Sequence, residues 1–312
     1  MNKYFWLLVS LIFGCFILWR INSFFELFAL KNAHIYTREN KEFRVMTYNI
    51  NATLGDEDIE TVKNTLLCEI TKYSPDILCL QEMSSPLYKS VHTFLDSIFE
   101  YNESNNKEPS QYLIYSKRPI KDYKRYPYVI PLDTIGSETI KIYSTTMKWG
   151  MPVYSAEIEV EPDRWVTFFS VHLRSSAYST ARRSMGEDAS WIKGLPLYYK
   201  NYSEGKKLRN YEADNIRHHL EELEAKDCPI LIAGDFNDWS GSSCMNKIRN
   251  GLYKDAWWEG GFGFGITYDG WHLKLRLDHI LYNHHFRLKD VSVEKSEFSD
   301  HRPLIADFTL AD

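Results

Sequence analysis

Short apolar runs, separated by Pro, Gly, Asn or Asp, recur along the chain from residue 43 to residue 310. They are rich in Val, Ile, Phe and Tyr, which is typical of β-strands bounded by turn residues. We therefore predict strands over residues 43–50, 77–83, 111–120, 139–149, 152–160, 165–173, 230–234, 276–283 and 301–310.

Two of the segments between these runs have helical spacing instead. The first carries apolar residues at Ile59, Val62, Leu66 and Ile70 and ends before Pro75. The second carries them at Leu208, Ile216, Leu220 and Leu223. The polar and aromatic segment 174–207 has no clear period, and a loop of that length is usually functional or partly helical. Strands interleaved with helices indicate a layered α/β or α+β domain.

The N-terminus has a different pattern, an uncharged and mostly apolar run from Tyr4 to Trp19. It is shorter than the roughly 20 residues of a membrane-spanning helix, but the long side chain of Arg20 can reach the interface and segment 21–30 adds apolar length. A cleaved signal peptide is the alternative, although no A-x-A site follows promptly. We predict a membrane anchor over residues 1–30, a linker over 31–42, and a catalytic domain over 43–312 that lies outside the cytoplasm.

Composition narrows the class of protein. With 312 residues and 44% hydrophobic content, the chain is long enough to bury a substantial core. A net charge of -5 argues against a protein covered in basic charge for nucleic-acid binding, although a local basic groove stays compatible with it. The five cysteines include no CxxC pair and no spacing typical of a zinc site.

Polar residues with acid–base or metal-binding side chains lie at the ends of several apolar runs. Each one alone has an ordinary explanation, such as a turn, a helix cap or a buried histidine. As a set they favour one functional site: Asn49, Glu82, His172, Asp235, Asn237, Asp278, Asp300 and His301.

The residue types in this set indicate the chemistry. Carboxylates and amides together form a hard oxygen site suited to Mg²⁺ or Mn²⁺, and without thiolates or three clustered histidines zinc is disfavoured. The two histidines add proton transfer near neutral pH. A divalent cation beside acid and base groups is suited to phosphoester hydrolysis, because it offsets the charge on the phosphoryl oxygens.

Six strings in this order, "TYNI", "PDILCLQE", "SVHL", "GDFND", "RLDHIL" and "SDHRPL", resemble the endonuclease/exonuclease/phosphatase superfamily, which has the DNase I-like fold. The resemblance extends from Arg44 to Phe308. It implies an α/β fold, a four-layer sandwich of two packed mixed sheets flanked by helices. The superfamily includes nucleases, sphingomyelinases and inositol-polyphosphate phosphatases, so the strings do not identify the substrate.

The resemblance also implies a role for each residue. Glu82 resembles the principal metal-binding carboxylate, with Asn49 and Asp300 beside it. His301 resembles the general base that activates water, oriented by Asp278. Asp235 and Asn237 resemble the residues that position the nucleophile and hold the phosphate or a metal. His172 resembles the residue that donates to a phosphoryl oxygen. Attack on phosphorus is expected to invert its configuration without a covalent enzyme intermediate.

Some positions depart from the pattern or have two explanations. Asn51 stands where some relatives have an acid, which weakens the prediction of a second metal contact. Residues 116–118 either place positive charge near the site or form a solvated turn before Pro119. The glycine-rich segment 260–270 is either a rim loop that contacts substrate or a tight turn. Arg276 either contacts phosphate or pairs with a carboxylate, and Asp238 is predicted to be a turn or cap residue.

We therefore predict a membrane-anchored, Mg²⁺-dependent phosphoesterase, with Mn²⁺ as an alternative cation. Its substrate is a phosphorylated molecule, either nucleic acid, phospholipid or a small phosphoester, and no protein partner is indicated. A nuclease is the first alternative. A catalytically inactive binding module is disfavoured because every motif acid and both histidines are present, and a sugar or peptide hydrolase lacks its characteristic motifs.

Overall fold

The computed structural model describes residues 10–15, 17–18, 28–30, 38, 41–51, 58–102, 112–126, 152–176, 191–270 and 273–311. They contain two six-stranded sheets. One has the order β15 (Phe286–Val293), β16 (Leu304–Leu310), β2 (Phe43–Asn49), β3 (Ile77–Gln81), β5 (Tyr112–Ser116) and β4 (Tyr101–Asn102). The other has the order β10 (Lys254–Asp255), β14 (Asp278–Tyr282), β9 (Ile230–Asp235), β8 (Arg164–His172), β7 (Val153–Glu161) and β6 (Ile120–Tyr126).

Both sheets are mixed. The pairs β2–β3 and β8–β9 are parallel, whereas the other neighbours within the two sheets are antiparallel. The crossover between β2 and β3 is α2 (Ile59–Tyr73), and the crossover between β8 and β9 contains α6 (Trp191–Glu224). Each parallel pair is therefore a strand, helix, strand unit, the arrangement that a parallel connection requires.

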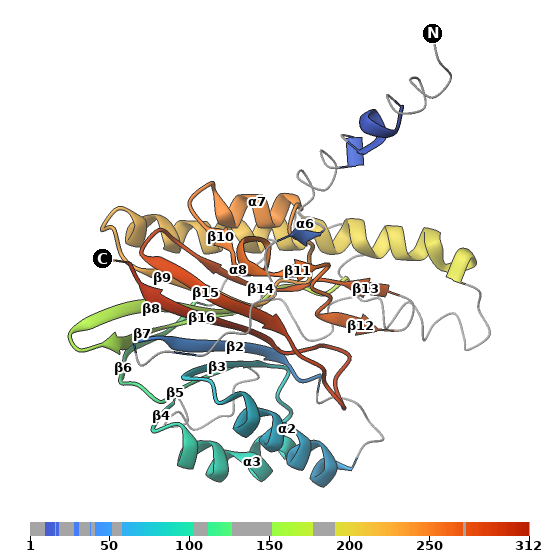
Figure 1. Cartoon of the computed structure of the whole chain (residues 1–312). Helices are drawn as coiled ribbons and strands as arrows, with labels where there is room; N and C mark the ends of the chain where they lie inside the picture. The colour runs from blue at the N-terminus through green and yellow to red at the C-terminus, as the bar shows by residue number, and fades with distance from the viewer. Residues whose placement is uncertain are drawn as a thin grey trace.

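Helices cover the outer faces of the two sheets (Figure 1). On one side α2 and α3 (Ser85–Ile98) bury their apolar faces in a cluster that includes Leu66, Leu95 and Leu80. On the other side α6 and α7 (Ser243–Arg249) do the same around Leu220 and Ile232. A third apolar cluster contains residues of both sheets and lies between them. The predicted α/β fold of two packed mixed sheets flanked by helices is thereby confirmed.

Local signals explain the boundaries of α2. The side chain of Asp58 accepts a hydrogen bond from the backbone of Glu60 at the N-terminus, and Ser74 ends the helix in the left-handed conformation with φ of 45°. The predicted face of Val62, Leu66 and Ile70 is buried. This helix follows the sequence pattern closely because its caps and its apolar face agree.

Smaller elements complete the described residues. The strand β1 (Ala29–Leu30) pairs with β11 (Phe262–Gly263), and β12 (Tyr268–Gly270) pairs with β13 (Leu273–Leu275). A short helix, α8 (Ala256–Gly260), follows β10. Ala29 is 1% exposed within the core between the sheets, although it falls in the segment predicted to be an anchor.

The N-terminal prediction is wrong. In the described part of the chain, no helix is long and apolar enough to cross a membrane, which overturns the predicted transmembrane helix and the membrane-anchored location. A spanning helix needs about 20 apolar residues, whereas the described helical residues in this segment are 10–15 and 17–18. The rest of segment 1–30, apart from 28–30, lies outside the described residues.

Two further expectations changed. The helix predicted from Leu208 begins at Trp191. Residues 191–207, the second half of segment 174–207, are therefore helical although they show no clear period. Tertiary contacts rather than period stabilise that part. The strand predicted over 139–149 lies outside the described residues.

Candidate active site

The site forms where the carboxyl ends of the parallel strands meet. In register, Asn49 of β2 lies beside Gln81 of β3, and His172 of β8 lies beside Asp235 of β9. The strand β14 is antiparallel to β9, so its first residue, Asp278, pairs with Asp235. Residues far apart in the sequence thus come to one edge of the two sheets.

Asn49 joins the two sheets at this edge. Its Nδ2 donates to Glu82 Oε1 and to Asp235 Oδ2, both at 3.0 Å, and its Oδ1 accepts from the backbone of Asn51 at 3.0 Å. His172 Nε2 lies 3.4 Å from the same Glu82 oxygen and 3.6 Å from Asp235 Oδ2. The Asp235 side chain is 1% exposed and that of Glu82 is 29% exposed, so the group extends from the interior to solvent.

The backbone is specialised at these positions. Glu82 has φ of 59°, a left-handed conformation that a residue with a side chain rarely adopts and that often marks functional sites. Gly234 has φ of 149°, and a Cβ there would lie 1.8 Å from the Val171 carbonyl oxygen. Only glycine therefore allows β8 and β9 to approach closely just before His172 and Asp235.

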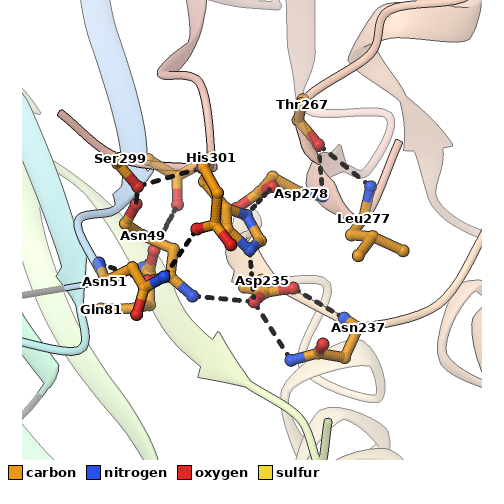
Figure 2. Close-up of polar contacts among 12 residues, drawn as sticks. Asn49, Asn51, Gln81, Asp235, Asn237, Thr267, Leu277, Asp278, Ser299 and His301 are labelled. Carbon is orange, nitrogen blue, oxygen red and sulfur yellow. Dashed lines mark hydrogen bonds and ion pairs between the residues drawn. The ribbon is translucent and has the colours of Figure 1, made fainter. Parts of the chain in front are cut away.

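His301 and Asp278 form a buried pair (Figure 2). His301 Nδ1 lies 2.8 Å from Asp278 Oδ2, and His301 Nε2 lies 3.8 Å from Asp235 Oδ2, beyond direct hydrogen-bond distance. Because Nδ1 is engaged with Asp278, the ring turns its Nε2 toward the carboxylate that Asn49 also contacts. This is the orientation that a general base needs.

Three residues that the sequence patterns did not identify hold this pair in place. Thr267 Oγ1 accepts from the backbone of Leu277 and of Asp278, both at 3.0 Å. Ser299 Oγ donates to the Asn49 carbonyl at 2.8 Å and accepts from the His301 backbone at 3.0 Å. The Tyr268 ring lies 5.0 Å from the His301 ring. Thr and Ser are common in loops, so their types alone carried no signal.

Asp300 is held by a residue distant in the sequence, and Asn237 by a local contact. Asn51 Nδ2 donates to Asp300 Oδ1 at 2.8 Å, which ties the loop before His301 to the end of β2. The backbone and the Nδ2 of Asn237 donate to the two oxygens of Asp235, at 2.8 and 3.1 Å. The departure at Asn51 thus places an amide, not an acid, against Asp300.

The electrostatics follow from three acids around one imidazole. Burial alone would lower the pKa of His301, but the charges of Asp278 and Asp235 outweigh it and raise this pKa to about 10. Burial raises the pKa of Asp235, and the neighbouring His301 counteracts part of that rise. Without a further positive charge to balance the acids, His301 is therefore most stable as the doubly protonated, positively charged imidazolium.

The donor set fits a divalent cation. Two groups of possible ligands share Asp235: one is Glu82, His172 and Asp235, the other Asp235, Asp278 and His301. In addition, Asp278 Oδ1 is buried without a hydrogen-bond partner among the described residues. The site therefore holds more buried carboxylate oxygens than nearby hydrogen-bond donors. A hard divalent cation can coordinate the oxygens that remain without a donor.

The structure therefore brings together seven of the eight predicted residues through direct contacts: Asn49, Glu82, His172, Asp235, Asn237, Asp278 and His301. Asp300 joins them through Asn51, and it belongs to neither of these two ligand groups.

The positions with two explanations are now decided. Ser116 pairs with Ile77, at the opposite end of β3 from Gln81, so residues 116–118 lie away from the site. Arg276 pairs with Asp255 at 2.6 Å. Asp238 lies in a bend and forms a buried ion pair with Arg209 at 3.1 Å.

In segment 260–270, Gly261 and Gly265 lie against Trp257, where a Cβ would come within 2.5 and 2.4 Å of its ring. The end of the segment reaches the site through Thr267 and Tyr268, and the backbone of Asp269 donates to the Asp300 carbonyl at 2.8 Å. The glycines therefore serve close packing, and the segment contributes to the site through its last residues.

This chain belongs to the Endonuclease/Exonuclease/phosphatase family, whose sequence model matches residues 46–301. Members of the family are generally hydrolases of phosphoesters and typically depend on a divalent metal. A UPF0294 protein of Vibrio campbellii is 30% identical over 144 residues, which are 45% of this chain and 46% of the relative. A UPF0294 protein of Vibrio parahaemolyticus is 29% identical over 142 residues, 45% and 46% of the two chains. These matches span about half the length of either relative.

Solved structures show the same fold. The human nocturnin catalytic domain, solved with a bound sulfate anion, has a TM-score of 0.60 and 18% identity over 88% of this chain and 96% of its own. TDP2 from Caenorhabditis elegans has a TM-score of 0.60 and 19% identity over 86% and 75%. TDP2 from D. rerio, complexed with a single-strand DNA product, has a TM-score of 0.58 and 14% identity over 86% and 100%.

Proposed function

We propose that this chain hydrolyses a phosphoester with the help of Mg²⁺, with Mn²⁺ as a substitute, and that His301 is the general base. The observation that carries the proposal is the orientation of His301: its Nδ1 is engaged with Asp278 at 2.8 Å, and its Nε2 points toward Asp235 at 3.8 Å. A water molecule beside this gap, within about 2.8 Å of both Nε2 and Asp235 Oδ2, would donate to both.

In this mechanism His301 Nε2 takes a proton from that water as its oxygen attacks phosphorus and the bond to the leaving oxygen breaks. Asp278 keeps the Nδ1 proton in place and stabilises the imidazolium that forms. Asp235 orients the water through the oxygen that faces His301, while Asn237 and Asn49 fix the carboxylate.

Glu82 and Asp235 would hold the cation together with His172 or with Asn49 and Asp300, since family membership and the excess of acids both favour such a site. When bound, the cation supplies Lewis-acid stabilisation of the phosphoryl oxygens. If His172 is not a ligand, its Nε2 is placed beside Glu82 and Asp235 to donate to a phosphoryl oxygen.

A nuclease is the second candidate. The similar structure of D. rerio TDP2 contains a single-strand DNA product, and nocturnin contains a sulfate, an anion with the shape of phosphate. The net charge of -5 weighs against a broad basic surface for nucleic acid. Phospholipids and small phosphoesters are therefore included among the substrates to be assayed.

The full chain should be incubated with Mg²⁺ or Mn²⁺ and separately with plasmid DNA, RNA, sphingomyelin, inositol phosphates and bis-p-nitrophenyl phosphate. We expect turnover of at least one substrate, abolished by chelation and lowered about 10²- to 10⁴-fold by His301→Ala. His218→Ala, at an exposed residue of α6, is the matched control and should retain the activity. A folded protein that turns over none of these substrates, or a His301→Ala variant with full activity, would contradict the proposal.

The metal ligands are tested separately by calorimetry. Glu82→Gln keeps the size of the side chain and removes its charge, so the affinity for Mn²⁺ should fall while the melting temperature changes little. Unchanged affinity would exclude Glu82 as a ligand.

A further inference from the structure

Another group of possible metal ligands lies far from the active site. Asp227, His284 and His285 each offer one ligand atom, and these atoms all lie within 4.8 Å of one another. Asp227 precedes β9, which ends at Asp235, and the two histidines follow β14, which begins at Asp278. At about 3.3 Å per residue, the length of β9 separates this group from the active site by roughly 17 Å.

The distances within the group suit a coordinated ion. Asp227 Oδ1 lies 3.1 Å from His285 Nε2 and 3.4 Å from His284 Nε2. Metal–ligand bonds of about 2.0–2.2 Å at tetrahedral angles separate neighbouring ligand atoms by about 3.3 Å. Both imidazoles therefore already approach one carboxylate oxygen at the spacing of ligands around one ion. Their ring centroids are 4.1 Å apart.

The side chain of Asn283 connects the two loops of this group, and a backbone hydrogen bond fixes His285. Asn283 Oδ1 accepts from the Ile230 backbone at 3.2 Å, and Asn283 Nδ2 donates to the Cys228 carbonyl at 2.8 Å. The Ala311 backbone donates to the His285 carbonyl at 2.7 Å. The turn with the histidines and the loop with Asp227 are thus positioned by bonds that do not involve the three ligand side chains, which lowers the conformational cost of binding.

We propose that Asp227, His284 and His285 bind a divalent transition metal of the Zn²⁺, Ni²⁺ or Cu²⁺ class. Imidazole nitrogens suit these ions, whereas Mg²⁺ prefers oxygen ligands. The side chains of Asp227 and His284 are 75% and 71% exposed, so water completes the coordination. The ion links the loop after α6 to the turn between β14 and β15. Because it binds the folded chain, it raises the stability without taking part in hydrolysis.

The test is a calorimetric titration of the full chain with Zn²⁺ in the presence of saturating Mg²⁺. The wild type should bind one Zn²⁺ more than the double variant His284→Ala/His285→Ala. His284→Ala or Asp227→Asn alone should weaken this binding about tenfold or more, since loss of even an outer-shell partner costs 10- to 100-fold. Zn²⁺ should also raise the melting temperature of the wild type more than that of the double variant.

The matched control is the double variant His218→Ala/His219→Ala. These adjacent histidines on α6 have ring centroids 5.6 Å apart and belong to none of the possible ligand groups in the described residues. This control should bind Zn²⁺ as the wild type does. The proposal is overturned if the wild type and the His284→Ala/His285→Ala variant bind the same number of ions with equal affinity, because the contacts to Asp227 are then hydrogen bonds only. Should the double variant not fold, His284→Ala at an exposed position gives the same answer.

Discussion

Asp278 and His279 are neighbours at the start of β14, and each belongs to a buried Asp–His pair. His301 Nδ1 lies 2.8 Å from Asp278, and His279 Nδ1 lies 2.8 Å from Asp255. Successive residues of a strand point to opposite faces, so the first pair faces the active site and the second faces away from it. The two pairs share residue types, distance and burial, and they differ in their surroundings.

The surroundings give the pairs different chemistry. His279 Nε2 is engaged with the Asp238 carbonyl at 3.1 Å, so both of its nitrogens have partners. Burial alone would raise the pKa of Asp255, but Arg276 and His279 hold it well below its usual range. Within the described residues, His301 forms ion pairs with two acids, Asp278 and Asp235, and its Nε2 points at Asp235 across 3.8 Å. We therefore expect the Asp278–His301 pair, whose Nε2 faces Asp235 across a gap, to be the reactive one of the two.

The largest difference between the two pairs should appear in the turnover number when Asp278 or Asp255 is replaced by uncharged Asn. Asp278→Asn should lower the turnover number about 10³-fold or more, because the amide no longer holds the catalytic tautomer of His301. Asp255→Asn should leave the turnover number of the folded fraction nearly unchanged. Initial rates on the substrate with the highest turnover measure both. Equal losses in the two variants would show that the comparison is wrong.

The second difference concerns stability. Arg276→Met leaves Asp255 buried without its cation, which should cost about 3–5 kcal/mol in the free energy of unfolding. The control is Arg302→Met, which removes a half-exposed ion pair with Asp269 and should cost no more than about 1 kcal/mol. Urea unfolding followed by circular dichroism measures both. A cost at Arg276 as small as that at Arg302 would contradict the structural role of the Asp255 pair.

A third prediction concerns protonation without metal. In the presence of a chelator, an NMR titration should give His301 a pKa of about 10, and Asp278→Asn should lower it. Since the pKa is raised above the usual value of about 6.5, the pair stabilises the fold fully below pH 6.5 and loses this effect as the pH rises through 10. Adding Mg²⁺ should lower this pKa, because the cation offsets the charge of the acids. A normal pKa in the chelated wild type would contradict this prediction.

The smallest effect is expected at Glu69, another buried acid. Burial raises its pKa to about 7. A raised acid pKa costs no stability below about pH 4.5, where the carboxyl is neutral in both states, and costs most above pH 7. Glu69→Gln should therefore stabilise the protein at pH 8 and have little effect at pH 4.5. Urea unfolding at the two pH values measures the difference, and an equal effect at both would refute the assignment.

Local sequence patterns were sufficient for much of the fold. The apolar runs around Val45, Leu78 and Ile232 became buried strands, and the helical spacing from Ile59 to Ile70 became α2. These features depend on residues a few positions apart, so a short window contains the information. The same holds for the strand ends, where Asn49, Glu82, His172 and Asp235 could be recognised as candidate site residues.

One prediction that failed and one position that was left open both depended on distant partners. The apolar N-terminus suggested an anchor, yet Ala29 is buried in the core because β11 supplies a neighbour more than two hundred residues later. Residues 116–118 were ambiguous because the antiparallel register of β5 against β3, not their charge, decides which end of the sheet they occupy.

Residue types and their order were thus enough to predict the class of fold and to nominate eight polar residues, seven of which the structure brings into direct contact. Only the tertiary structure decided that Thr267 and Ser299 support the Asp278–His301 pair and that Asn51 holds Asp300. The physical reason is that protonation and orientation depend on charges and donors within a few ångströms, and strand pairing, not sequence separation, sets those neighbours.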